Sequence, residues 1–104
     1  MKSGLLEKDI ENILKAISQF PEIEKLIIFG SRAMGNYKTG SDVDLAVFGK
    51  NVSDKTIKRL SDLLNEELPL PYFFDVVDYN AITNKDLKKH IDIEGKEIFP
   101  NQIQ

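Results

Sequence analysis

The chain has 104 residues with no cysteine, 41% hydrophobic residues and 30% charged residues, a composition typical of one globular domain. A net charge of −3 argues against a broad nucleic-acid surface, and the lack of cysteine excludes disulfides and agrees with a cytoplasmic location. No stretch is apolar for long enough to span a membrane, so we expect residues 1–104 to form a single domain without a membrane partner.

The N-terminal half predicts one helix and two strands. Residues from about 4 to 19 form an amphipathic helix that ends before Pro21, with apolar side chains at helical spacing: Leu6, Ile10, Ile13, Leu14 and Ile17. Residues 25–29 (KLIIF) and 43–48 (VDLAVF) are apolar and favour β structure, so they predict two strands.

A second helix and a third strand follow. Ser53 is placed to cap a helix that reaches about Glu67, and Pro69 and Pro71 prevent it from continuing. Residues 72–78 (YFFDVVD) predict the third strand.

The C-terminal part predicts a short helix and one more extended segment. Thr83 and Asp86 resemble a capping box that opens a helix to about Asp92, which Gly95 ends. Residues 96–99 form a last short strand or a tail. The order α-β-β-α-β-α-(β) predicts an α/β (α+β) fold, a small mixed sheet with helices packed on it.

The segment between the first two strands carries the strongest functional signal. It reads GSRAMGNYKTGSDVDL, from Gly30 to Leu45. Glycines let the backbone approach a phosphate closely, and the amides at the start of a helical turn suit an anion. Asp42 and Asp44 stand two residues apart at the start of the second strand, so their side chains point the same way. Two carboxylates beside a phosphate-binding loop predict a site for Mg²⁺ and a nucleotide.

Gly-Ser, ten residues and then Asp-x-Asp resembles the signature of the DNA polymerase β-like nucleotidyltransferase superfamily. The local form GSRAMG…SDVDLAV is similar to the minimal nucleotidyltransferase (MNT) domains of type VII toxin–antitoxin pairs, whose antitoxins are of the MntA type. The resemblance covers the whole chain in length and in order of elements. It implies a polymerase β-like fold, ATP as substrate and two Mg²⁺ ions.

A site with two metal ions ~4 Å apart needs a third carboxylate near Asp42 and Asp44. Asp75 and Asp78 are the candidates, and their odd spacing puts them on opposite faces of a regular strand. Asp75 lies inside an apolar run, where an unpaired buried carboxylate is costly, so we expect it to join the site. Asp78 fits an ordinary turn. The resemblance agrees, because the superfamily's third acidic residue lies on such a strand.

Four residues are predicted to bind the nucleotide: Gly30, Ser31, Arg32 and Ser41. Ser31 contacts the terminal phosphates, caps a helix, or does both. Arg32 either reaches a phosphate or lies solvated in a turn, and the sequence does not separate the two. Ser41 is placed to cap or orient the turn that precedes Asp42.

Two further residues are expected to be structural. His90 is the only histidine and lies on a late helix, where packing is the usual role. The resemblance demands no histidine for catalysis. Tyr79 follows the third strand, where we expect it to pack rather than to stack on a base.

The predicted fold uses nearly every residue and leaves no room for a domain that holds an acceptor. The acceptor then comes from a partner or from a second copy of the chain. The resemblance implies a HEPN-domain RNase toxin as the partner, with AMP transferred from ATP to a toxin tyrosine and this chain acting as the antitoxin. Two alternatives stay open: an idle binding module that neutralises its partner by occlusion, and an enzyme that modifies a small-molecule hydroxyl.

Overall fold

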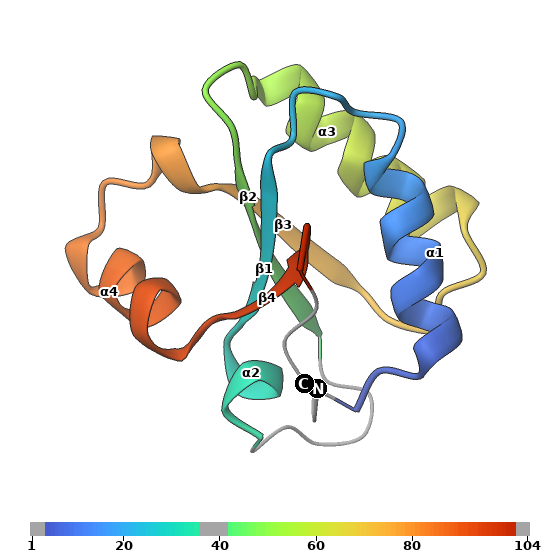
Figure 1. The fold of residues 1–104 in the computed structure, drawn as a ribbon, viewed down its shortest axis with the longest axis horizontal. Helices are drawn as coiled ribbons and strands as arrows, with labels where there is room; N and C mark the ends of the chain where they lie inside the picture. Colours follow the sequence, from blue (N-terminus) through green and yellow to red (C-terminus); the bar gives the residue numbers. More distant parts are fainter. Residues whose placement is uncertain (1–3, 36–41, 102–104) are drawn as a thin grey trace.

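A mixed sheet of four strands, in the order β3-β2-β1-β4, forms the centre of the molecule (Figure 1). The central strand β1 (Lys25–Phe29) pairs antiparallel with β2 (Val43–Phe48) and with β4 (Lys96–Phe99). The edge strand β3 (Phe74–Asp78) pairs in parallel with β2. The sheet is therefore mixed, as the sequence predicts.

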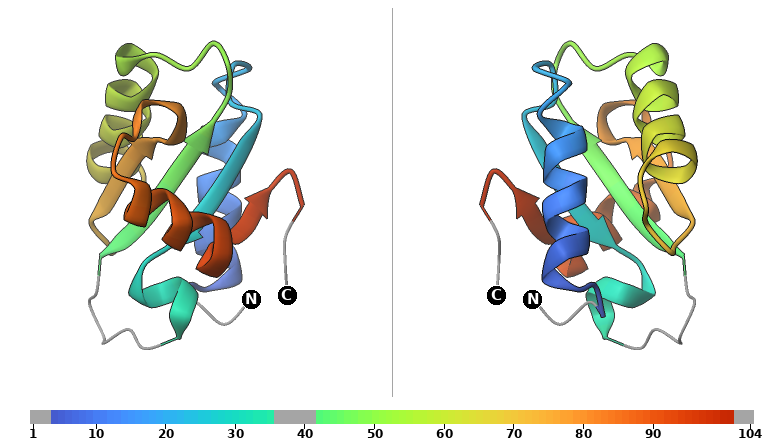
Figure 2. Two further views of the ribbon diagram at one scale, coloured as in Figure 1. Left: turned by 90° about the vertical axis from the view of Figure 1, so that its left-hand side faces the viewer. Right: turned by 90° about the vertical axis from the view of Figure 1, so that its right-hand side faces the viewer.

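The computed structural model describes residues 4–35 and 42–101. Helices α1 (Glu7–Ile17) and α3 (Asp54–Asp62) cover one face of the sheet, and α4 (Lys85–Glu94) lies on the other (Figure 2). A short helix, α2, follows β1 directly. The helical segments are α1 (Glu7–Ile17), α2 (Ser31–Met34), α3 (Asp54–Asp62), a π-helical turn η1 (Leu63–Glu67), a 3-10 turn η2 (Tyr79–Ala81) and α4 (Lys85–Glu94).

Strand β2 is buried on both faces of the sheet, and its alternation separates two clusters of side chains. Val43, Leu45 and Val47 face the larger cluster, beneath α1 and α3. Ala46 packs with Ile91 of α4 on the opposite side. Asp44 shares the face of Ala46 by the same alternation, so its carboxyl group stands on the α4 side of the sheet.

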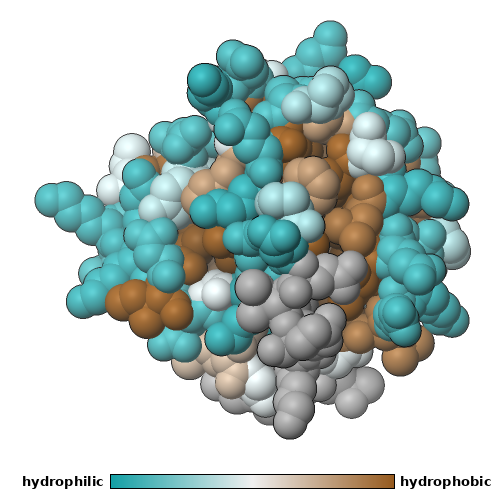
Figure 3. Space-filling model, viewed as in Figure 1, coloured by the Kyte–Doolittle hydropathy of each residue, from teal (hydrophilic) through white to brown (hydrophobic). Residues whose placement is uncertain are grey.

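The surface agrees with this layered packing. Figure 3 shows hydrophobic side chains along the seam between the sheet and α1, surrounded by hydrophilic ones. Within the described ranges, no helix is both long enough and apolar enough to span a membrane.

Most predicted elements are present, with shifted ends. The N-terminal helix is confirmed but shorter, and β3 begins at Phe74 rather than at residue 72. The predicted cap at Ser53 is confirmed, because its hydroxyl accepts a hydrogen bond of 3.3 Å from the amide of Thr56. The final strand forms, as β4.

The predicted capping box at the start of α4 is wrong by one residue. The helix is capped by Asn84, whose Oδ1 accepts a hydrogen bond of 3.1 Å from the amide of Leu87. Asn84 has the extended backbone of an N-cap, so its amide oxygen reaches the first turn and Thr83 lies outside the helix.

Candidate active site

The register of three neighbouring strands brings the motif residues together. Phe29, the last residue of β1, pairs with Asp44 of β2, and Asp44 pairs with Asp75 of β3. Side chains at paired positions share a face, and neighbouring strands lie about 4.8 Å apart. The loop that starts at Gly30 therefore begins beside the two carboxylates.

Gly30 is held in a conformation that favours glycine. Its φ of 75° lies in the left-handed region, and it forms the N-cap of α2. A Cβ at this position would collide with Oδ2 of Asp44, so the carboxyl group of Asp44 lies directly against the Gly30 backbone. The predicted N-cap role of Ser31 is wrong, because Gly30 is the N-cap and Ser31 is the first residue inside α2.

His90 of α4 contacts the same glycine. The backbone N–H of Gly30 donates a hydrogen bond of 3.0 Å to Nε2 of His90, and the imidazole meets the ring of Phe29 edge-on. Because Nε2 accepts, the geometry assigns the imidazole proton to Nδ1. His90 packs against Phe29 as expected of a structural residue, but its hydrogen bond with the motif glycine was not predicted. Its one sequence signal is that it is the only histidine.

The carboxyl group of Asp44 lies close enough to two other carboxylates to be affected by their charge. Burial raises the pKa of Asp44, and the negative charges of Asp75 and Asp42 raise it further, while His90 opposes the change. Asp44 is half-buried, whereas Asp42 and Asp75 are exposed. The cost of placing these charges together makes the cluster a place where a cation would stabilise the protein.

The prediction that Asp75 is buried is wrong. Asp75 is exposed because β3 is the edge strand of the sheet. Its predicted face is confirmed by its pairing with Asp44. Asp78 behaves as an ordinary turn residue, since its Oδ1 accepts a hydrogen bond of 3.1 Å from the amide of Asn80.

The donors present suit Mg²⁺. Carboxylate oxygens are the ligands that Mg²⁺ prefers. Asp44 and Asp75 offer them from paired positions on one face of the sheet, and Asp42 stands two residues before Asp44. In the part of the chain that the structure describes, no three acidic or imidazole groups already converge on one point.

Arg32 lies on the inner side of α2 and not in solvent. It is 3% exposed, and its guanidinium carbon lies 4.9 Å from the centre of the Tyr72 ring. The Tyr72 hydroxyl donates a hydrogen bond of 2.9 Å to the buried carboxyl of Asp9, which also accepts from the amide of Leu6. The solvated alternative for Arg32 is therefore wrong, and this network joins α2 to α1.

Two other predicted residues remain. Ser41 lies outside the described residues, so its predicted role stays a prediction. Tyr79 packs as expected: its ring stacks on Phe48 at 4.2 Å, and its hydroxyl donates a hydrogen bond of 2.6 Å to Asp92. This hydrogen bond to Asp92 raises the pKa of the Tyr79 hydroxyl.

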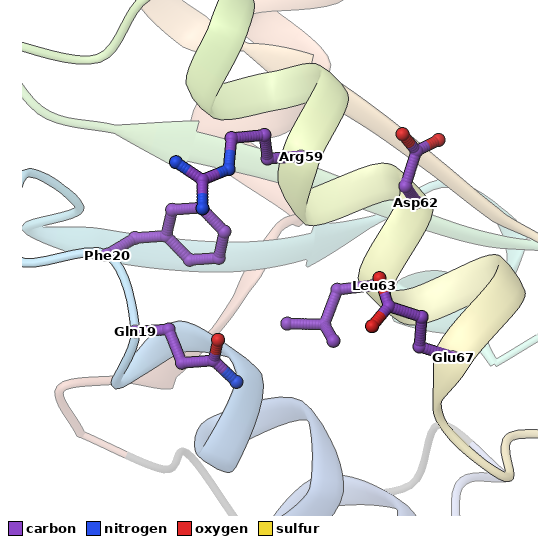
Figure 4. Close-up of a pocket in the computed structure, with 6 residues that line it drawn as sticks. All are labelled: Gln19, Phe20, Arg59, Asp62, Leu63 and Glu67. Carbon is purple, nitrogen blue, oxygen red and sulfur yellow. The ribbon is translucent and has the colours of Figure 1, made fainter.

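Two hollows mark the surface of the described chain near α3. One, of about 460 Å³, runs between α3 and β3 and includes Asp75. The other, of about 210 Å³, lies between the end of α1 and α3 (Figure 4). In Figure 4 the side chains of Arg59 and Leu63 project toward Phe20 and Gln19. This second hollow contains none of the predicted site residues.

Comparison with solved structures shows a shared fold. A chain from a toxin–antitoxin crystal structure with AMP-PNP aligns with a TM-score of 0.74 at 23% identity, covering 89% of this chain and 74% of that one. A chain from an MntA–HepT toxin–antitoxin structure aligns at 0.70 and 19% identity, covering 92% and 74%.

A third structure contains the tri-AMPylated Shewanella oneidensis HEPN toxin in complex with an MNT antitoxin. The alignment has a TM-score of 0.69 at 20% identity and covers 91% of this chain and 72% of that one. No curated protein matches the sequence.

The family comparison covers nearly the whole chain. Residues 11–104 match the model of the polymerase beta nucleotidyltransferase family, and the match includes Gly30, Ser31 and all three clustered aspartates. The sheet register and this match agree: the chain belongs to the polymerase beta nucleotidyltransferase family.

Proposed function

We propose that this chain is a Mg²⁺-dependent adenylyltransferase that transfers AMP from ATP to a tyrosine of a partner HEPN-domain toxin and so acts as the antitoxin of a type VII pair. The observation that carries the proposal is the register that aligns Phe29, Asp44 and Asp75 across three strands, with Gly30 directly after Phe29. The chain spans 74% of the AMP-PNP-bound relative and about as much of the others, and those relatives are toxin–antitoxin complexes.

In this proposal each residue of the motif has a separate task. Gly30 lets the backbone approach the triphosphate. The hydroxyl of Ser31, at the start of α2, donates a hydrogen bond to a terminal phosphate oxygen. Asp42 and Asp44 hold Mg²⁺, and Asp75 joins them toward the edge of the sheet. Bound Mg²⁺ supplies electrophilic stabilisation of the phosphate charges.

In the chemical step, one phosphorus–oxygen bond forms and another breaks. The tyrosine oxygen forms a bond to the α-phosphorus of ATP, and the bond from that phosphorus to pyrophosphate breaks. The hydroxyl proton passes to the exposed carboxylate of Asp75, which is placed at the open edge where an acceptor from another chain can reach it. The products are AMP-tyrosine and pyrophosphate.

Arg32 is assigned a supporting task. Its guanidinium lies over Tyr72 inside the protein, so we assign it to holding α2 in place, with direct phosphate contact as the predicted alternative. Replacing Arg32 by Lys would distinguish them, because Lys keeps the charge but loses the planar group that stacks on the ring.

The test is transfer of radiolabel from α-³²P-ATP to a purified HEPN-domain partner, with and without Mg²⁺. Labelled partner only in the presence of Mg²⁺ supports the proposal. A tight complex that blocks the partner's RNase activity without any labelling would instead support the occlusion module. Labelling of a small hydroxyl compound but not of the partner would support the other alternative.

A further inference from the structure

At the outer edge of β3, the backbone of Phe74 is hydrogen-bonded to a side chain, whereas the next outward-facing backbone, that of Val76, is not. The amide of Val43 donates to the carbonyl of Phe73, so the backbone groups of Phe73, Asp75 and Val77 face β2, and those of Phe74 and Val76 face outward. The side chain of Asn65 satisfies both outward backbone groups of Phe74. Its Oδ1 accepts a hydrogen bond of 2.7 Å from the Phe74 amide, and its Nδ2 donates one of 3.0 Å to the Phe74 carbonyl.

Asn65 reaches this position because it lies in the π-helical turn at the end of α3. Its side-chain amide imitates one residue of an additional strand. Within the described part of the chain, β3 has a neighbouring strand on one side only, which is β2. There, no side chain is hydrogen-bonded to the outward-facing backbone groups of Val76. The edge is therefore protected where Asn65 stands and available one step further along.

A hollow accompanies this open edge. Its volume is about 460 Å³, and it is lined by α3 and the start of β3: Asp54, Ile57, Lys58, Ser61, Asp62, Phe73, Phe74, Asp75 and Val76. Phe73 is 58% exposed at its rim, which is unusual for so large an apolar side chain. Lys58 is paired with Asp62 at 3.3 Å, so the remaining charges, those of Asp54 and Asp75, are negative.

We propose that the free edge of β3 takes up an extended segment of the acceptor protein as a fifth strand, with its outward-facing side chains divided between this hollow and the active site. The proposal rests on the function proposed above and names how its acceptor docks. The segment carries a hydroxyl side chain, flanked on both sides by apolar or basic residues.

Strand alternation explains this division. Side chains at neighbouring positions of adjacent strands share a face, so the added residue beside Asp75 projects to the face of Asp75 and Asp44. Its neighbours project to the opposite face, that of Phe74 and Val76, where they pack against Ile57 in the hollow and meet the carboxylate of Asp54, while the exposed ring of Phe73 lies at the rim. Main-chain hydrogen bonds to Val76 fix the register and so place the acceptor hydroxyl at Asp75.

Hydrogen exchange gives a direct test. We would record amide exchange by NMR for the ¹⁵N-labelled chain, alone and in complex with the unlabelled HEPN-domain protein. The amide of Val76 is expected to exchange rapidly alone and to be protected about tenfold or more in the complex. The amide of Phe74, already bonded to Asn65, is the internal control and is expected to change much less.

A pair of alanine variants tests the hollow by kinetics. Phe73→Ala is expected to raise the KM for the HEPN-domain protein by about tenfold, with kcat and the affinity for Mg²⁺-ATP unchanged, because an exposed aromatic anchor is lost. Ile93→Ala is the matched control, since Ile93 is 62% exposed on α4, away from the hollow. It is expected to leave the KM unchanged.

The outcomes separate docking from chemistry. Three results overturn the docking proposal, even if AMP is transferred. They are a complex in which the Val76 amide stays unprotected, an equal KM for Phe73→Ala and Ile93→Ala, and no complex at all. Protection of Val76 without AMP transfer upholds the docking and overturns the proposed function.

Discussion

Glycine at position 30 meets two requirements at one residue. The backbone needs a positive φ at the start of α2, and the carboxyl group of Asp44 occupies the space of a Cβ. Any other residue would strain the turn and push Asp44 away from the loop. The close approach of loop and carboxylate is thus a direct consequence of the absence of a side chain.

Ser31 gives the first prediction at this scale. Because Gly30 and not Ser31 caps α2, Ser31→Ala should leave the Tm of the nucleotide-free protein nearly unchanged. It should weaken ATP binding roughly tenfold, since a hydrogen bond to a charged group is worth ~1.5–3 kcal/mol. Calorimetric titration with Mg²⁺-ATP measures the affinity.

The matched control for Ser31 is Ser53, which caps α3. Ser53→Ala should lower the free energy of unfolding by ~1 kcal/mol and leave ATP affinity unchanged. If Ser31→Ala lowered the Tm as Ser53→Ala does while ATP still bound normally, the phosphate contact would have to be abandoned.

Asp44 gives a prediction about pH in the absence of metal. Its pKa in the fold is raised by burial and by the charges of Asp75 and Asp42. The neutral form is therefore favoured by folding, and its contribution to stability is present below the unfolded pKa and lost as the pH rises through the folded pKa. Asp44→Asn keeps a neutral side chain of the same shape, so it should raise the Tm by a few degrees at pH 7 in EDTA.

Thermal melts between about pH 4 and pH 7 check this prediction. The difference in Tm between Asp44→Asn and the unaltered chain should grow with pH across this range. Asp78→Asn, which lies on the other face of β3, should show no such growth. A lower Tm for Asp44→Asn at pH 7 would mean that the charge is already compensated in the metal-free protein.

At the scale of elements, α4 supports the loop that follows β1. Its His90 accepts the N–H of Gly30, so His90→Ala would leave that amide without a partner at the mouth of the site. We expect ATP affinity to fall about tenfold and the Tm to fall as well. His90→Gln retains a side-chain acceptor and should recover part of both.

Nucleotide titration of both His90 variants decides the role of α4. Recovery of ATP affinity by Gln but not by Ala would assign His90 to positioning the Gly30 backbone. Unchanged ATP affinity in His90→Ala, alongside a lower Tm, would reduce the contact to packing.

The sequence predicts the elements well where local patterns determine them. The strands 25–29 and 43–48 and the cap at Ser53 follow from apolar runs and a short polar side chain. The start of α4 was misplaced because Thr83 and Asn84 are both good caps and only the backbone path selects Asn84. Such choices depend on tertiary structure rather than on local preference.

In the candidate site too, some features follow from local sequence and others depend on tertiary structure. The face shared by Asp44 and Asp75, and with it the choice of Asp75 over Asp78, follows from strand alternation. The exposure of Asp75 depends on which strand is at the edge, and the contact between His90 and Gly30 joins residues 60 positions apart. Neither can be read from local sequence.

At the scale of the whole molecule, the fold concentrates negative charge at the starts of the neighbouring strands β2 and β3. Mg²⁺ and ATP together should relieve this repulsion and stabilise the native state by mass action. At a concentration one hundred times the Kd, the gain is about 2.7 kcal/mol, or a Tm increase of roughly ten degrees for a domain of this size. Differential scanning fluorimetry measures it.

The controls for this increase in Tm are Mg²⁺ and ATP added separately, and a variant of the site. Mg²⁺ alone should raise the Tm slightly, ATP with EDTA should add repulsion and give no increase, and Asp44→Asn should lose most of the joint effect. A Tm indifferent to Mg²⁺ and ATP together, at millimolar levels, would count heavily against a working site.

The most direct measurement of the central claim is AMP transfer from ATP to the HEPN-domain partner by two aspartate variants, with circular dichroism to confirm folding. Asp75→Asn removes the proton acceptor and one metal ligand but keeps the size of the side chain, so it should abolish transfer. Asp78→Asn, on the opposite face of the same strand, should retain most of it. Full transfer by Asp75→Asn with loss in Asp78→Asn would contradict the account.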